Sequence, residues 1–125
     1  MRIAVTIWND KVSPVFDTAS RLLIIEAEKL NETARFKTYL YEQDISRRCL
    51  RIQDLKVNVL ICGAISRPFS MLLMSAGIEI ISGISGPAED VLSAYLHGSL
   101  PNSRFLMPGC KNNSLTQLKE EKEII

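Results

Sequence analysis

The chain has 125 residues, of which 15 are Lys or Arg and 14 are Asp or Glu, so its formal net charge is +1. This length allows one domain with its own hydrophobic core, and the 46% hydrophobic content excludes disorder along the whole chain. The near-neutral charge provides no broad cationic field, so we expect no nucleic-acid partner.

Three strands are predicted in the first third of the chain. Residues 3–8 are apolar on both faces, as expected for an interior strand. Residues 22–28 form a second strand, and residues 35–41 form a third that alternates between polar and apolar side chains. The alternation fits a half-solvated edge strand.

Helices and strands alternate in the rest of the chain. Asp44 is a predicted N-cap for a helix that ends near Leu55, and the neighbouring cations Arg47, Arg48, Arg51 and Lys56 are interpreted as a solvated basic face of that helix. Residues 57–62 form a buried strand. Ser66 caps a second helix that ends near residue 76, residues 78–82 form a fifth strand, and a third helix begins at Pro87.

The resulting order βββαβαβα predicts an α/β fold with helices on both faces of the sheet. A meander of three strands, followed by a helical crossover, gives a five-stranded mixed sheet of order 3-2-1-4-5 in which strand 2 is antiparallel. This order is typical of the ribonuclease H-like motif. We assign residues 1–105 to a single α/β domain and residues 106–125 to a polar C-terminal tail.

Scattered cysteines bear on the cellular location and on metal binding. Cys49, Cys62 and Cys110 are odd in number and none is paired at Cys-x-x-Cys spacing, which argues against a disulfide framework. The apolar start is too short for a secretory signal, and the apolar stretch 71–84 is shorter than the roughly 20 residues of a membrane span. We therefore expect a cytoplasmic protein with no membrane partner.

A topological switch point is predicted between the first and fourth strands, where a crevice should open at their carboxyl ends. Asn9, Asp10 and Ser13 follow the first strand, and Gly63 and Ser66 follow the fourth. We expect these five residues to donate or accept hydrogen bonds around a ligand. Glycine at such turns is also explained by steric need alone, and that alternative stays open.

Candidate metal ligands are Cys62 at the predicted crevice, Cys110 in a predicted turn and His97 in the last turn of the third helix. For Cys62, a small core residue is the other interpretation. The first and fourth strands lack the acids that two-metal nucleases need, and no partner for His97 is evident, so we expect no enzymatic activity.

Several segments, in this order, resemble the dinitrogenase iron-molybdenum cofactor biosynthesis family. They are RIAV at residues 2–5, KVSPVFD at 11–17, VLICGAI at 59–65, AGIEI at 76–80 and GISGPAEDVLSAYLHG at 83–98. The resemblance covers about residues 1–100 and implies a ribonuclease H-like fold without nuclease activity. For the nitrogenase members it also implies non-catalytic binding and delivery of an iron-sulfur cofactor or its precursor. Such members often carry His where this chain has Val15.

Two functions are consistent with these features. The first is a carrier or scaffold for an iron-sulfur or iron-molybdenum-type cluster, with metallocluster assembly proteins as partners and with a homodimer as one way to share a cluster between chains. The alternative is a metal-independent interaction or regulatory module, which would bind a protein partner or a small anion through backbone donors at Gly63 and Gly86.

Overall fold

The computed structural model describes residues 1–100 and 103–108. Within them, the strands are β1 (Arg2–Trp8), β2 (Lys11–Val12), β3 (Arg21–Glu28), β4 (Asn31–Tyr39), β5 (Val59–Ile61) and β6 (Glu79–Ile81). The α-helices are α1 (Ile45–Asp54), α2 (Arg67–Ser75) and α3 (Ala88–Leu96). Two short 3-10 helices are η1 (Phe16–Thr18) and η2 (Ser103–Phe105).

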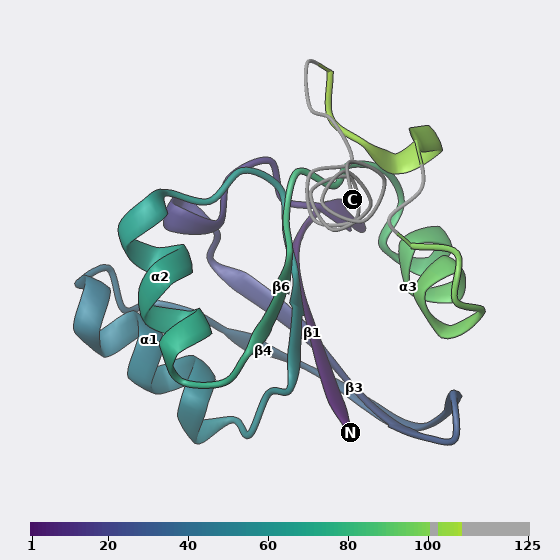
Figure 1. The fold of residues 1–125 in the computed structure, drawn as a ribbon, viewed down its shortest axis with the longest axis horizontal. Helices are drawn as coiled ribbons and strands as arrows, with labels where there is room; N and C mark the ends of the chain where they lie inside the picture. The colour runs from purple at the N-terminus through teal and green to yellow at the C-terminus, as the bar shows by residue number, and fades with distance from the viewer. Residues whose placement is uncertain (101–102, 109–125) are drawn as a thin grey trace, which may run out of the picture.

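All described strands belong to one mixed sheet with the order β4-β3-β1-β5-β6, and β2 pairs with β1 outside this path (Figure 1). β1 is antiparallel to β3 and parallel to β5, and β6 is parallel to β5. The mixed α/β class is therefore confirmed.

The predicted number of five strands is wrong, because the sheet has six. Lys11 and Val12, which we expected in a loop, pair with Trp8 and Ile7 and form the short strand β2. The turn between β1 and β2 consists of Asn9 and Asp10, whose φ angles of 49° and 64° suit a two-residue hairpin. The predicted third strand also begins earlier than expected, at Asn31, and ends at Tyr39.

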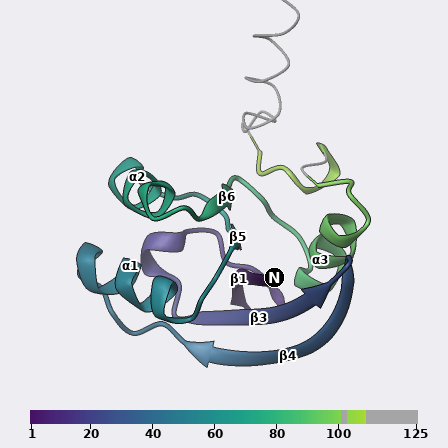
Figure 2. The same cartoon turned by 60° about the horizontal axis from the view of Figure 1, so that its bottom comes forward.

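The helices cover both faces of the sheet, and each face has its own core (Figure 2). α1 and α2 lie together on one face and α3 lies on the other. Because side chains alternate along a strand, Ile3, Val5 and Ile7 of β1 pack into the core under α3, while Ala4 packs into the core under α1 and α2. Both faces of β1 are thus buried, which explains its continuous apolar sequence.

Packed structure continues past the predicted domain boundary at residue 105. Leu106 forms a bridge with Ile84, and the Met107 N–H donates to the Gly83 carbonyl at 2.8 Å. The remainder of the predicted tail from residue 109, which includes Cys110, lies outside the described residues. None of the helices that the structure describes has the length and apolarity needed to cross a membrane.

Candidate functional site

The β1–β2 hairpin is joined by hydrogen bonds to the loop that precedes α3. The Val12 N–H donates to the Gly86 carbonyl and the Ala88 N–H donates to the Asp10 carbonyl, both at 2.9 Å. Lys11 and Pro87 form an isolated bridge between the same two segments. The structure therefore brings together the loops that follow β1 and β6 at one end of the sheet.

Residues 13–19, which we call the strap, cover the carboxyl ends of β1 and β5. The Ala64 N–H donates to the Pro14 carbonyl at 2.8 Å, and the Phe16 N–H donates to the Ala64 carbonyl at 2.7 Å. Ser13, which is buried, donates its N–H to the Thr6 carbonyl at 2.8 Å. The crevice predicted at this switch point is thus filled by the chain itself.

Gly63 is required by the close approach of the strap. A Cβ atom built on Gly63 would lie 2.3 Å from the Pro14 carbonyl oxygen and 2.5 Å from that of Ser13, distances that no side chain can occupy. Gly63 therefore serves backbone packing. The interpretation of this glycine as part of an anion cradle has no support in the geometry.

Carboxylates of the chain occupy the helix starts next to the switch point. Asp17 Oδ1 accepts a hydrogen bond of 3.0 Å from the Ser66 N–H at the beginning of α2, whereas the Ser66 hydroxyl makes no cap bond. Glu89 and Asp90 lie in the first turn of α3. Negative charge at these positions is stabilised by the helix dipoles and would repel an incoming anion. The small-anion form of the alternative hypothesis is therefore disfavoured here.

Arg48 is the most unexpected residue near the strap. We placed it on a solvated helix face, but only 1% of its surface is exposed. Its guanidinium donates to the carbonyls of Phe16 and Ala19 in the strap and to those of Leu40 and Glu42 before α1. The guanidinium also lies 4.9 Å from the centroid of the Phe16 ring.

Desolvation by burial lowers the pKa of Arg48, and the charges of Asp17 and Glu42 act in the opposite direction. Arg47, by contrast, is exposed as predicted. Arg48 is next to Cys49 and four residues before Ile52, so it shares the buried face of α1, and this spacing was the signal in the sequence that could have identified it.

Cys62 lies at the end of β5 beneath the strap and is completely buried. It belongs to the core under α1 and α2, together with Phe16 and Phe69. Burial, with a smaller effect from the charge of Asp17, raises the pKa of the Cys62 thiol to about 12. In this conformation Cys62 is a protonated core thiol, which differs from the accessible thiolate that ligand binding requires.

The other predicted site residues are distributed over both sides of the sheet. Asn9 and Asp10 are exposed in the hairpin turn. His97 is exposed at the end of α3, on the sheet face opposite Cys62, and its Nδ1 atom lies 2.7 Å from the Ser93 carbonyl oxygen. The structure thus brings Cys62 close to Ser13, Gly63 and Ser66 but does not bring it to His97. Across residues 1–100 and 103–108, no three His, Cys, Asp or Glu side chains gather as a metal site.

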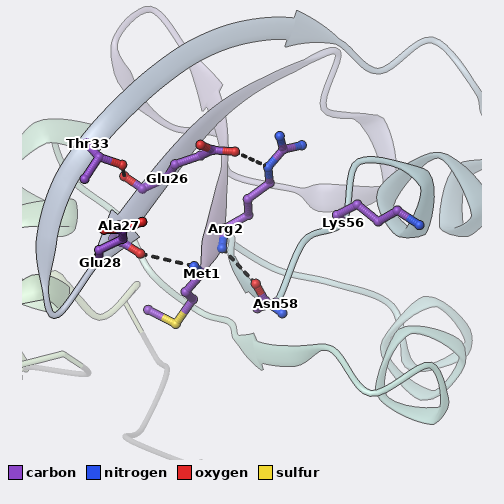
Figure 3. A pocket seen from close by; sticks show the side chains of 8 residues that line it. All are labelled: Met1, Arg2, Glu26, Ala27, Glu28, Thr33, Lys56 and Asn58. Carbon is purple, nitrogen blue, oxygen red and sulfur yellow. Dashed lines mark hydrogen bonds and ion pairs between the residues drawn. The ribbon is translucent and has the colours of Figure 1, made fainter.

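A pocket of about 360 Å³ lies at the opposite end of β1 from the strap (Figure 3). It is lined by Met1, Arg2, Glu26, Ala27, Glu28, Thr33, Lys56 and Asn58. Arg2 Nε forms an ion pair with Glu26 Oε1 at 2.6 Å, and the Arg2 N–H donates to Asn58 Oδ1 at 2.8 Å (Figure 3). These bonds tie Arg2 to β3 and to the residue before β5 at this end of the sheet. Sequence reasoning did not identify it.

These features define a small mixed-sheet α/β domain whose loops converge at a switch point and are closed by a strap. The family model described as dinitrogenase iron-molybdenum cofactor matches residues 1–98. The chain belongs to this family.

Solved structures with the same fold include the protein PH0822, which is 21% identical with a TM-score of 0.76 over 82% of this chain and 95% of that chain. The apo form of the orange protein from Desulfovibrio gigas is 21% identical with a TM-score of 0.67, over 84% and 94% of the two chains. A protein from Methanocaldococcus jannaschii is 22% identical with a TM-score of 0.63, over 79% and 90%. No curated protein matches the sequence.

Proposed function

We propose that this protein is a non-catalytic, cytoplasmic carrier of an iron-sulfur or iron-molybdenum-type cluster or of its precursor. The observation that carries the proposal is the match of residues 1–98 to the dinitrogenase iron-molybdenum cofactor family. In the sheet, β1 is antiparallel to β3 and parallel to β5. This order supports the assignment of a ribonuclease H-like fold to the carrier. Its partners would be metallocluster assembly proteins.

The strap end of the sheet is the binding region that we favour. Asn9, Asp10 and Ser13 lie there on one side of the switch point, and Gly63 and Ser66 lie on the other. The Asn9 amide and the Ser13 and Ser66 hydroxyls are the donors among them that suit hydrogen bonds with cluster sulfides.

For direct ligation we retain the soft thiolates of Cys62 and Cys110. His97 is excluded from the same site because it lies on the other face of the sheet. Two thiolates from one chain leave a cluster with open positions, which a second copy of the chain or the donor protein would fill.

Anaerobic loading tests the proposal. The purified protein is incubated with ferrous iron, sulfide and molybdate, desalted, and analysed for absorbance and metal content. We expect the wild type to retain iron, the Cys62→Ser and Cys110→Ser variants to lose it, and the control Cys49→Ser to behave as the wild type, because Cys49 is a core residue of α1. Absence of iron from the wild type, or equal loading of Cys62→Ser, would contradict a cluster carrier that uses Cys62.

A specific observation favours the alternative of an interaction module. Tyr39 and Tyr41 stack at 5.0 Å between ring centroids, although they are 48% and 70% exposed, and Trp8 is 61% exposed. Exposed Tyr and Trp side chains are enriched at protein interfaces. Sedimentation of the wild type against a Tyr39→Ser/Tyr41→Ser double variant tests self-association. A dimer that the double variant loses assigns self-association to the tyrosine pair, and a monomeric wild type opposes a homodimer.

A further inference from the structure

We propose that the strap, residues 13–19, is a gate over a hidden ligand site whose floor is formed by Cys62 and Thr6. The nature of the cargo, a soft-metal cluster, rests on the proposed function. The gate itself rests only on the packing of the strap. Cys62 is completely buried in the closed form, so a ligand can reach its sulfur only after the strap has moved.

Thr6 provides the second, independent observation of a site. It is completely buried, and its Oγ1 atom has no hydrogen-bond partner within the part of the chain that the structure describes. Buried side-chain hydroxyls nearly always have a partner, so this orphan oxygen indicates a place for a ligand atom.

The strand register places this hydroxyl beside the thiol. Ala4 pairs with Leu60 and both face the core under α1 and α2; continuing the register sets Thr6 next to Cys62 on that same face. A polar oxygen and a soft sulfur therefore stand side by side beneath the strap.

Besides its backbone bonds to Ala64 and Thr6, the strap is held closed by three side-chain contacts with the helices on this face. Asp17 accepts from the Ser66 N–H at the start of α2, and Arg48 of α1 donates to the carbonyls of Phe16 and Ala19. The Phe16 ring packs edge-on against Phe69 of α2, with 5.3 Å between the ring centroids. The strap is thus latched by side chains whose removal leaves the sheet hydrogen bonds in place.

The ends of the strap allow it to move without unfolding the sheet. Val12, which precedes the strap, pairs with Ile7 in the β1–β2 ladder, and Arg21, which follows the strap, pairs with Ile7 in the β1–β3 ladder. Both ends of the strap are therefore fixed to β1. Opening breaks the two backbone bonds to Ala64, releases the Asp17 cap and the Arg48 bonds to the Phe16 and Ala19 carbonyls, and withdraws Phe16. The β1–β3 and β1–β5 ladders are retained, so the open form is a local rearrangement.

Thiol labelling in a Cys110→Ser background tests the gate. The protein is treated with a water-soluble maleimide, and modification of Cys62 and of Cys49 is followed separately by peptide mass mapping. Asp17→Ala removes one latch and should accelerate labelling of Cys62 roughly fivefold to tenfold, the usual effect of losing an N-cap carboxylate. Cys49 of α1 is buried and is exposed only by global unfolding, so in the wild type and in the variant it should be labelled more slowly than Cys62.

Asp44→Ala is the matched control. Asp44 caps α1 by accepting from the Arg47 N–H at 3.1 Å, so this variant loses an equivalent cap without touching the strap. The Asp44→Ala variant should not accelerate the labelling of Cys62 more than the labelling of Cys49. Equal labelling rates of Cys62 and Cys49 in the wild type, or no acceleration at Cys62 in Asp17→Ala, would overturn the gate.

Hydrogen exchange tests the gate on the wild type alone, so the result does not depend on whether a variant folds. The amides of Phe16 and Ala64, which bond across the strap, should exchange at least tenfold faster than the Cys62 amide, which donates to Ile81 at 3.0 Å between β5 and β6. Equal protection of all three amides would refute local opening. Neither measurement requires a cluster, so a failure of cluster loading and a failure of the gate are distinguished.

Discussion

Replacing Arg48 with Met should destabilise the fold far more than any other loss of an arginine from α1. Four carbonyl oxygens lose a donor in this variant, and each acceptor that stays buried and unpaired costs ~1–3 kcal/mol. The carbonyl of Glu42 is only partly buried and is reached by water. The Phe16 carbonyl keeps the Ala19 N–H as a donor, so the carbonyls of Leu40 and Ala19 are left unpaired and together would cost about 2–4 kcal/mol, towards the lower end of that range.

Relief of the buried charge acts in the opposite direction. The guanidinium of Arg48 is desolvated, as its lowered pKa indicates, and Met fills part of its volume without that penalty. We therefore expect a net loss of about 2 kcal/mol in the free energy of unfolding.

Urea unfolding followed by far-ultraviolet circular dichroism measures this difference, and Arg47→Met is the control. Arg47 is adjacent in the same helix but exposed, so its replacement should change the free energy of unfolding by no more than about 0.5 kcal/mol. If the unfolding free energies of the two variants agree within about 1 kcal/mol, the Arg48 guanidinium is not the donor that these buried carbonyls need. Arg48 would then not be one of the three side-chain contacts that hold the strap.

Three further outcomes are expected. Gly63→Ala should cost about 2–3 kcal/mol in thermal unfolding, because the new Cβ meets the Pro14 backbone at 2.3 Å; an unchanged melting temperature would show that the strap moves freely. Cys62 has a raised pKa in the folded state, so its contribution to stability is complete below the ordinary thiol pKa and is lost as the pH rises towards about 12. The wild type should therefore lose more stability than Cys62→Ala between neutral and alkaline pH. Parallel curves of unfolding free energy against pH for the two proteins would contradict this. Arg35→Met should cost less than about 1 kcal/mol at pH 7 because its two glutamate pairs are partly exposed. That cost should vanish in acid as the pH falls through the lowered pKa of Glu32, and a cost that persists at low pH would exclude the ion pair as its source.

Local sequence signals predicted the main elements well. Asp44 was predicted as the cap of α1, and its carboxylate accepts the Arg47 N–H. The apolar run of β1 predicted an interior strand, and both of its faces are buried. These features depend on neighbours within a few residues, which periodicity and capping rules describe. β2 was missed because a strand of two residues has no measurable period.

The closed state of the site depends on contacts between distant parts of the chain. Asp17 caps α2 at Ser66, which is 49 residues away, so the expected side-chain cap of Ser66 is replaced by a residue that no local rule would select. The approach of Pro14 to Gly63 is equally non-local. The residues of the switch point could therefore be predicted from the strand order, whereas the strap that fills it could not.

If Cys62 is a metal ligand, as the proposed function requires, its burial has to be reconciled with metal binding. With its pKa raised to about 12, the closed thiol keeps its proton at neutral pH, and a metal binds only the thiolate. Opening of the strap returns the sulfur to water and its pKa towards the ordinary value, so exposure and deprotonation occur together. Under the proposed carrier function, Cys62 would therefore bind soft metal only in the open form, and closure of the strap over Thr6 and Cys62 would favour release. The position of the strap would then decide whether the carrier holds its cargo or gives it up.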